Sequence, residues 1–207
     1  VATAERYDPA TNQWETLTPM SVARASLAAT VLNGKLYAIG GQGLSSVEIY
    51  DPQTGQWSTG PTLPSEVNRG TAITVNGKIL LIGGMNASSQ NINQVLELDP
   101  STNQWSQKAT MPTARHAAKL VLFNGNVLAI GGHAPDPTNK VEIYDPATNS
   151  WTTGPSLSPS RSWPSAWVAN GRIFVTGGHD GSSFLSSVQT LDPDTNQWVA
   201  AGSLPEN

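Results

Sequence analysis

The dipeptide Asp-Pro recurs along the chain at intervals of 43 to 48 residues, beginning at Asp8, Asp51, Asp99, Asp145 and Asp192. A tryptophan follows each of these aspartates by six residues, at Trp14, Trp57, Trp105, Trp151 and Trp198. Four of the tryptophans are followed after 19 residues by Asn-Gly, beginning at Asn33, Asn76, Asn124 and Asn170. A Gly-Gly pair follows each of these asparagines by seven residues. A fixed period of this length indicates stacked copies of one supersecondary unit.

Each period has the pattern of four short strands, here called A to D in chain order. In the first full repeat, Ala28–Leu32 and Leu36–Ile39 flank the turn at Asn33-Gly34. Asn-Gly between apolar runs is the strongest short hairpin signal, because both turn residues take a positive φ. Val47–Tyr50 predicts strand C, and the Asp-Pro turn leads into strand D with Trp57. No segment has a helical period, so we predict an all-β chain of propeller blades.

Strands A and B occur four times and strands C and D five times. The prediction is therefore four complete four-stranded blades plus a half blade, together forming one propeller domain. The half blade covers residues 1–23, and the blades cover 24–67, 68–114, 115–160 and 161–207. An open fan exposes unpaired edges that invite association. We expect part of a longer propeller or a ring completed by another chain, with a small open propeller as the alternative.

These marks resemble those of the kelch-repeat family along the whole chain, including the bacterial-type repeats. The family has Gly-Gly after an apolar strand B, then a tyrosine, then a tryptophan about six residues later. The glycines are Gly40, Gly41, Gly83, Gly84, Gly131, Gly132, Gly177 and Gly178. The tyrosines are Tyr50 and Tyr144, and leucine replaces them at Leu98 and Leu191. We expect the glycines to permit close backbone approach and the rings, including all five periodic tryptophans, to form the core between blades.

Composition excludes several functions. Charged residues are 13% of the chain and the net charge is -4, which argues against a disordered tail and against nucleic-acid binding. Without cysteine there is no disulfide, no thiolate metal site and no Cys-linked Tyr of the kind that kelch copper oxidases use. No catalytic, cofactor or metal motif is present, and no apolar run could span a membrane. We therefore predict no enzymatic activity and no cofactor, with a sugar mutarotase-like enzyme as the less favoured alternative.

Candidate binding residues gather where strand D joins the next strand A, at the same blade end as the B–C loops. Arg24, Arg115 and Arg161 each follow a periodic tryptophan by ten residues, and Arg69 follows by twelve. In kelch substrate-receptor adaptors, which this arrangement resembles, arginines at the start of strand A hold acidic peptides. A guanidinium offers a planar fork of donors for carboxylates. The alternative is a structural role, in which the arginines bond carbonyl groups of the blades.

The same face is expected to carry the histidines and two tryptophans outside the repeat: His116, His133, His179, Trp163 and Trp167. A tryptophan beside polar groups can serve as a stacking platform for a sugar or peptide, or it can simply fill the channel. The histidines match no metal motif. The recurring carboxylates Glu5, Glu48 and Glu142 are expected at the strand surface.

We predict a binding module that takes an extended peptide of a protein partner, or a glycan, at the mouth of the channel. The competing hypothesis is a structural repeat that self-assembles into homo-oligomers through its open blade edges. The surface is rich in Ser, Thr, Asn and Gln and resembles that of bacterial secreted kelch arrays, so an extracellular or cell-surface location is expected, with a cytoplasmic one as the alternative.

Overall fold

The computed structural model describes residues 1–205, in which there are 18 strands and no helix. The half blade is β1 (Ala4–Asp8) and β2 (Gln13–Leu17). The first blade is β3 (Ala28–Leu32), β4 (Lys35–Ile39), β5 (Val47–Asp51) and β6 (Gln56–Thr59), and the second is β7 (Thr71–Val75), β8 (Lys78–Ile82), β9 (Val95–Asp99) and β10 (Gln104–Gln107). The third is β11 (Lys119–Phe123), β12 (Asn126–Ile130), β13 (Val141–Asp145) and β14 (Ser150–Thr153), and the fourth is β15 (Ser165–Ala169), β16 (Arg172–Thr176), β17 (Ser187–Asp192) and β18 (Gln197–Ser203).

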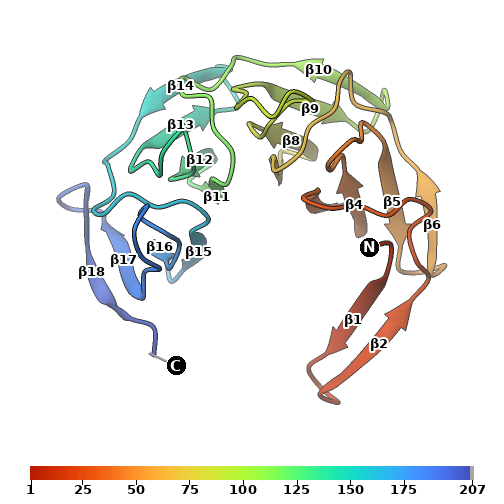
Figure 1. The fold of residues 1–207 in the computed structure, drawn as a ribbon, viewed down its shortest axis with the longest axis horizontal. Coiled ribbons are helices and arrows are strands. Elements are labelled where there is room, and N and C mark those ends of the chain that lie inside the picture. The colour runs from red at the N-terminus through yellow and green to blue at the C-terminus, as the bar shows by residue number, and fades with distance from the viewer. Residues whose placement is uncertain (206–207) are drawn as a thin grey trace.

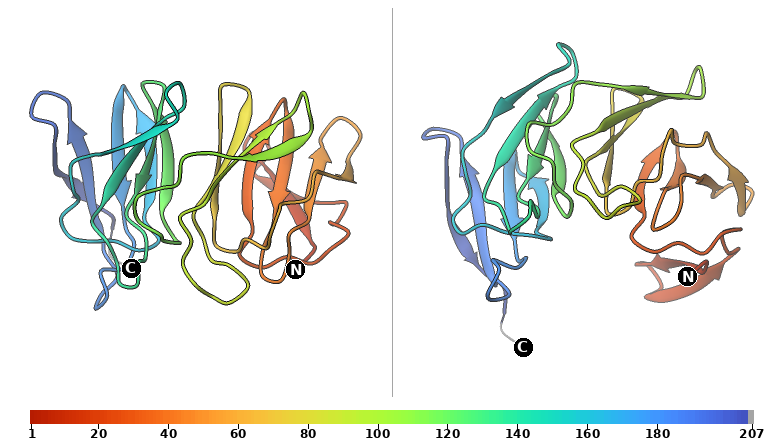
Figure 2. Two further views of the ribbon diagram at one scale, coloured as in Figure 1. Left: turned by 90° about the horizontal axis from the view of Figure 1, so that it is seen from above. Right: turned by 45° about the horizontal axis from the view of Figure 1, so that its top comes forward.

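The predicted all-β propeller, with four four-stranded blades and a half blade, is confirmed. Each blade is an antiparallel meander in which consecutive strands are neighbours. The blades stand side by side in an arc, with strand A innermost, strand D outermost, and an opening between β1–β2 and β18 (Figure 1). Seen edge-on, the arc has two faces formed by the loops at the two ends of the strands (Figure 2). No helix long and apolar enough to cross a membrane occurs among residues 1–205.

The Asn-Gly turns have the backbone that the sequence predicts. Asn33 and Gly34 have φ values of 52° and 75°, and the other three pairs repeat this conformation. Positive φ at both central residues is the mark of a type I′ turn, whose twist matches that of the flanking strands. The register follows from these turns, with Ala28 opposite Ile39 and Leu32 opposite Lys35 in the first blade.

The Gly-Gly pairs are the points where each blade meets the next one. The Gly84 N–H donates to the Arg115 carbonyl at 2.9 Å, and the Gly132 N–H donates to the Arg161 carbonyl at 2.7 Å. Gly83 has a φ of +61°, and a Cβ placed on it would collide with the Arg115 carbonyl. Only glycine allows both this conformation and this approach at Gly83, as expected, whereas a Cβ on Gly177 would meet nothing closer than 3.6 Å.

The periodic tryptophans also join consecutive blades, but they are not fully buried. The indole nitrogens of Trp57, Trp105, Trp151 and Trp198 donate at 2.8 to 2.9 Å to backbone carbonyls of the preceding blade or half blade. These four rings are half-buried at the blade interfaces, whereas Tyr50 and Tyr144 are buried. Trp14, in the half blade, is 69% exposed. The expectation that all five tryptophans are core residues is therefore wrong for Trp14, since no preceding blade covers it within the described residues.

Candidate functional site

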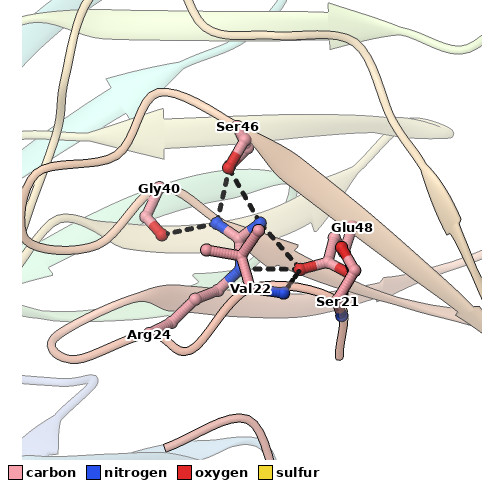
Figure 3. Close-up of polar contacts among 6 residues, drawn as sticks. All are labelled: Ser21, Val22, Arg24, Gly40, Ser46 and Glu48. Atoms are coloured by element: carbon pink, nitrogen blue, oxygen red, sulfur yellow. Dashed lines mark hydrogen bonds and ion pairs between the residues drawn. The ribbon is translucent and has the colours of Figure 1, made fainter. Parts of the chain in front are cut away.

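Arg24 lies inside the first blade instead of at the channel mouth (Figure 3). Its guanidinium donates to the carbonyls of Gly40 and Ser46, both at 2.8 Å, and pairs with Glu48 at 3.0 Å. Glu48 also accepts hydrogen bonds from the N–H and hydroxyl groups of Ser21. Burial raises the pKa of Glu48, but these hydrogen bonds and the one from Arg24 outweigh it and place the pKa below its ordinary value.

The third and fourth blades repeat this buried arginine. Arg115 pairs with Glu142 and donates to the Ala129 carbonyl at 3.0 Å. Arg161 is fully buried, but it faces the amide of Gln189 at 3.2 Å instead of a carboxylate. Burial lowers the pKa of both arginines, and Glu142 partly opposes the effect at Arg115.

These contacts correct two sequence-based expectations. Arg24, Arg115 and Arg161 hold strands A, B and C of one blade together, so their guanidinium groups are not available to an acidic ligand. Glu48 and Glu142 are buried partners of these arginines instead of strand-surface residues. Glu5, at the equivalent position of the half blade, is exposed because strands A and B are not present beside it.

A cavity of about 480 Å³ lies where the A strands begin, at the channel mouth. Its lining includes the residues that follow the first four periodic tryptophans by twelve positions: Ser26, Arg69, Ala117 and Trp163. All four have φ between 50° and 57°, although none is glycine. Left-handed backbone costs such residues about 1–2 kcal/mol each, and strain of this kind concentrates at ligand-binding sites. We call these four residues the mouth ring.

Backbone hydrogen bonds hold the mouth ring in this conformation. The Arg69 N–H donates to the Ser26 carbonyl at 2.8 Å, and the Trp163 N–H donates to the Ala117 carbonyl at 3.0 Å. The backbone is thus shared by the four blades, while the side chain differs in each. Arg69, the arginine that departs from the spacing of the other three, is the one that reaches the mouth, where it is exposed.

The charge at the mouth is positive. Arg69 and Lys119 both line the cavity, and neither side chain has an ion pair or hydrogen-bond partner among residues 1–205. None of the residues that line the cavity in this part of the chain is acidic. The whole chain carries a net charge of -4, so the positive mouth is a local feature.

Two histidines pack against Trp163 of the mouth ring, although neither lines the cavity itself. His116 and His133 face each other across an antiparallel bridge, with ring centroids 5.1 Å apart, and the Trp163 ring stacks on His133 at 6.2 Å. His116 is buried, and its Nδ1 lies 2.6 Å from the Asn91 Oδ1. Burial, with the nearby positive charges of His133 and Arg69, lowers the pKa of His116 to about 4. His116 is therefore neutral at neutral pH.

The other two candidates lie apart from the mouth. Trp167 is not part of its lining and stacks on Phe174 of strand β16, with centroids 5.6 Å apart. His179 lies one chain segment outward, opposite Ser162, and contacts Phe184. No cluster of three or more His, Cys, Asp or Glu side chains suited to a metal ion occurs in the described part of the chain.

Sequence reasoning missed Ser26, Ala117 and Lys119, which line the mouth, and the exposed Phe184. Ser26 and Ala117 could have been found by their position, because each lies twelve residues after a periodic tryptophan. Lys119 lies two residues further along strand A, and nothing in the repeat singles out Phe184.

Comparison with known proteins supports this architecture. A family model described as the KLHDC2/KLHL20/DRC7 Kelch-repeats domain matches residues 26–203, and a Kelch motif model matches residues 1–21. A stretch of 42 residues is 43% identical to Kelch repeat and BTB domain-containing protein 12 of Danio rerio, covering 20% of this chain and only 7% of that protein. The solved structure of YjhT has the same fold, with a TM-score of 0.83 and 19% identity over 94% of this chain and 75% of that one. The chain belongs to the kelch-repeat family.

Proposed function

We propose that the chain is a protein-interaction module that binds an extended acidic peptide of a partner at the channel mouth. The observation that carries the proposal is the pair of unpaired cations, Arg69 and Lys119, in a cavity without a carboxylate among the described residues that line it. Kelch domains generally bind proteins. An extended peptide can place an acidic side chain in an open cavity of this kind. Charge-assisted hydrogen bonds between a carboxylate and arginine are among the strongest hydrogen bonds in proteins.

The mouth is prepared for binding before the ligand arrives. The hydrogen bonds from Arg69 and Trp163 to the neighbouring blade hold both backbones in place. Trp163 is 57% exposed and is supported by the rings of His116 and His133. A rigid aromatic surface beside a cation loses little conformational entropy on binding. A mutarotase-like reaction would instead need an acid–base pair positioned at the channel, whereas the charged side chains that line this cavity among the described residues, Arg69 and Lys119, are both cations.

Self-association is the second candidate, and one observation favours it. Trp14 exposes to solvent the ring that four other tryptophans place against a preceding blade. A second copy could cover this face. Sedimentation velocity over a range of concentrations tests it: a mass that rises with concentration, and that Trp14→Ser returns to the monomer, supports assembly.

The binding proposal is tested with a fluorescein-labelled oligoglutamate peptide and with the double variant Arg69→Gln and Lys119→Gln. The expected result is salt-sensitive binding to the wild type, reduced at least about tenfold in the variant, since two charge-assisted contacts are lost. Arg172→Gln is the control, because Arg172 is the exposed first residue of β16, next to the A–B turn at the opposite end of the blade. Equal binding by the double variant and the control contradicts the proposal. An oligogalacturonate probe, tested in parallel, shows whether an acidic glycan is preferred.

A further inference from the structure

Phe184 is the most exposed of the large apolar side chains in the part of the chain that the structure describes. It lies in the loop between β16 and β17 of the fourth blade, at the same face as the mouth ring, and is 89% exposed. Its ring rests edge-on against His179, with centroids 5.0 Å apart and the planes at 77°. A phenylalanine this exposed contributes little to the core, and aromatic side chains are enriched at protein–protein interfaces.

The loop that carries Phe184 is ordered by its own hydrogen bonds. The Asp180 carboxylate accepts hydrogen bonds from the N–H groups of Ser182 and Ser183, both at 2.8 Å, and from the Ser182 hydroxyl at 3.0 Å. The Gly181 N–H donates to the His179 Nδ1 at 3.0 Å. The loop is therefore ordered in the free chain, and a partner that binds the ring does not have to order it.

Phe184 lies at a defined place relative to the mouth. Residues Ser162, His179 and Phe184 are consecutive neighbours in two antiparallel bridges, and Ser162 directly precedes Trp163 of the mouth ring. Adjacent extended segments are about 4.8 Å apart, so the Phe184 backbone lies about 10 Å outward from that of Ser162. An extended peptide, which rises about 3.3 Å per residue, crosses this distance with about three residues.

We propose that Phe184 is the second anchor of the binding face and that it takes an apolar side chain of the acidic peptide. The partner then has a defined polarity across the face. Its acidic residue lies at Arg69 and Lys119, its backbone crosses Trp163, and a leucine, isoleucine or aromatic residue about three positions beyond the one at Trp163 packs on Phe184. This inference rests on the proposed function and adds to it the second half of the recognised motif.

The test is selection of short random peptides displayed on phage, carried out in parallel on the wild type, on Phe184→Ala, on Phe184→Leu and on Arg69→Gln with Lys119→Gln. The wild type is expected to enrich peptides with Asp or Glu and an apolar residue at a constant spacing. Phe184→Ala is expected to keep the acidic preference and lose the apolar one, whereas Phe184→Leu keeps both. Circular dichroism and the melting temperature establish that each variant is folded.

The outcomes separate the two proposals. If the double variant loses the acidic preference while Phe184→Ala selects the same peptides as the wild type, the mouth binds acidic peptides but Phe184 is not an anchor. If no variant changes the selection, or the wild type enriches nothing, both proposals fail. If Phe184→Ala instead abolishes a concentration-dependent rise in mass, the ring is covered by a second copy of the chain and the anchor proposal is overturned.

Discussion

At equivalent buried positions, the third blade has an arginine–glutamate pair and the second blade has apolar residues. This difference allows a test of what the buried arginine contributes to the stability of the fold. Strand B places one residue directly opposite the strand C position that carries the glutamate: Ala129 faces Glu142, and Leu81 faces Leu96. In each blade, this pair packs in the same buried region as the residue that follows the periodic tryptophan by ten positions, so that three positions can be compared between blades. The third blade has Arg115, Ala129 and Glu142, whereas the second blade has Val67, Leu81 and Leu96.

We expect Glu142→Leu alone to be strongly destabilising and the triple variant, which combines Arg115→Val, Ala129→Leu and Glu142→Leu, to be nearly neutral. The single change leaves the Arg115 guanidinium buried without its carboxylate, which costs about 3–5 kcal/mol. The triple variant copies the second blade, where Leu81 and Leu96 are 2% and 1% exposed beside Val67. Replacing a buried ion pair by packed apolar residues is often neutral or better, so we expect a loss of at most about 1 kcal/mol.

Thermal and urea unfolding, followed by circular dichroism, measure both effects. For a chain of this size, each kcal/mol shifts the melting temperature by about 2–4 °C, so Glu142→Leu is expected to lower it by roughly 10 °C. Glu142→Gln copies the fourth blade, where Gln189 faces Arg161. Its melting temperature should lie between those of Glu142→Leu and the triple variant. The reasoning is refuted if the triple variant is as unstable as Glu142→Leu, or if Glu142→Leu costs less than about 1 kcal/mol.

Three further outcomes are expected. Gly83→Ala should lower the unfolding free energy by at least about 1–2 kcal/mol, because it adds a Cβ against a neighbouring carbonyl at a φ of +61°; an unchanged urea midpoint contradicts this. Gln189→Glu should not raise the melting temperature, because the anionic partner that it gives the buried Arg161 is offset by loss of the hydrogen bond that the Gln189 amide donates to the Ser158 carbonyl at 2.8 Å; a clear rise in the melting temperature contradicts this. His116 should titrate by NMR with a pKa of about 4, and Arg69→Gln should raise this pKa by removing a nearby positive charge. Because the unfolded chain binds this proton more tightly, stability should fall as the pH drops from about 6.5 towards about 4.

The fold could be predicted from the sequence because its rules are local. Asn-Gly turns, Gly-Gly pairs and the Asp-Pro turn each act within a few residues, and their constant spacing sets the blades. The exposure of Trp14 depends instead on whether a blade stands before it, which the spacing of the repeat does not describe.

The candidate site was harder to predict, because it depends on which way side chains point across strands. The arginine spacing was correct, but the direction of Arg24 and Arg115 is set by Glu48 and Glu142 on a strand more than 20 residues away. A signal for this existed: arginine and glutamate occur together in the first and third blades, and both are replaced in the second, by Val67 and Leu96. The left-handed backbone of the mouth ring left no such signal, since no glycine marks it.

The tryptophan hydrogen bonds between blades have a consequence for how the chain is made. Each indole donor lies 39 to 44 residues after the carbonyl that accepts from it. During synthesis, which proceeds from the N-terminus, the accepting carbonyl has therefore left the ribosome before its tryptophan does. Repeat arrays gain most of their stability from nearest-neighbour contacts, so each finished blade can serve as the template on which the next one docks. The order of the contacts along the chain suits a propeller that assembles blade by blade as it is translated.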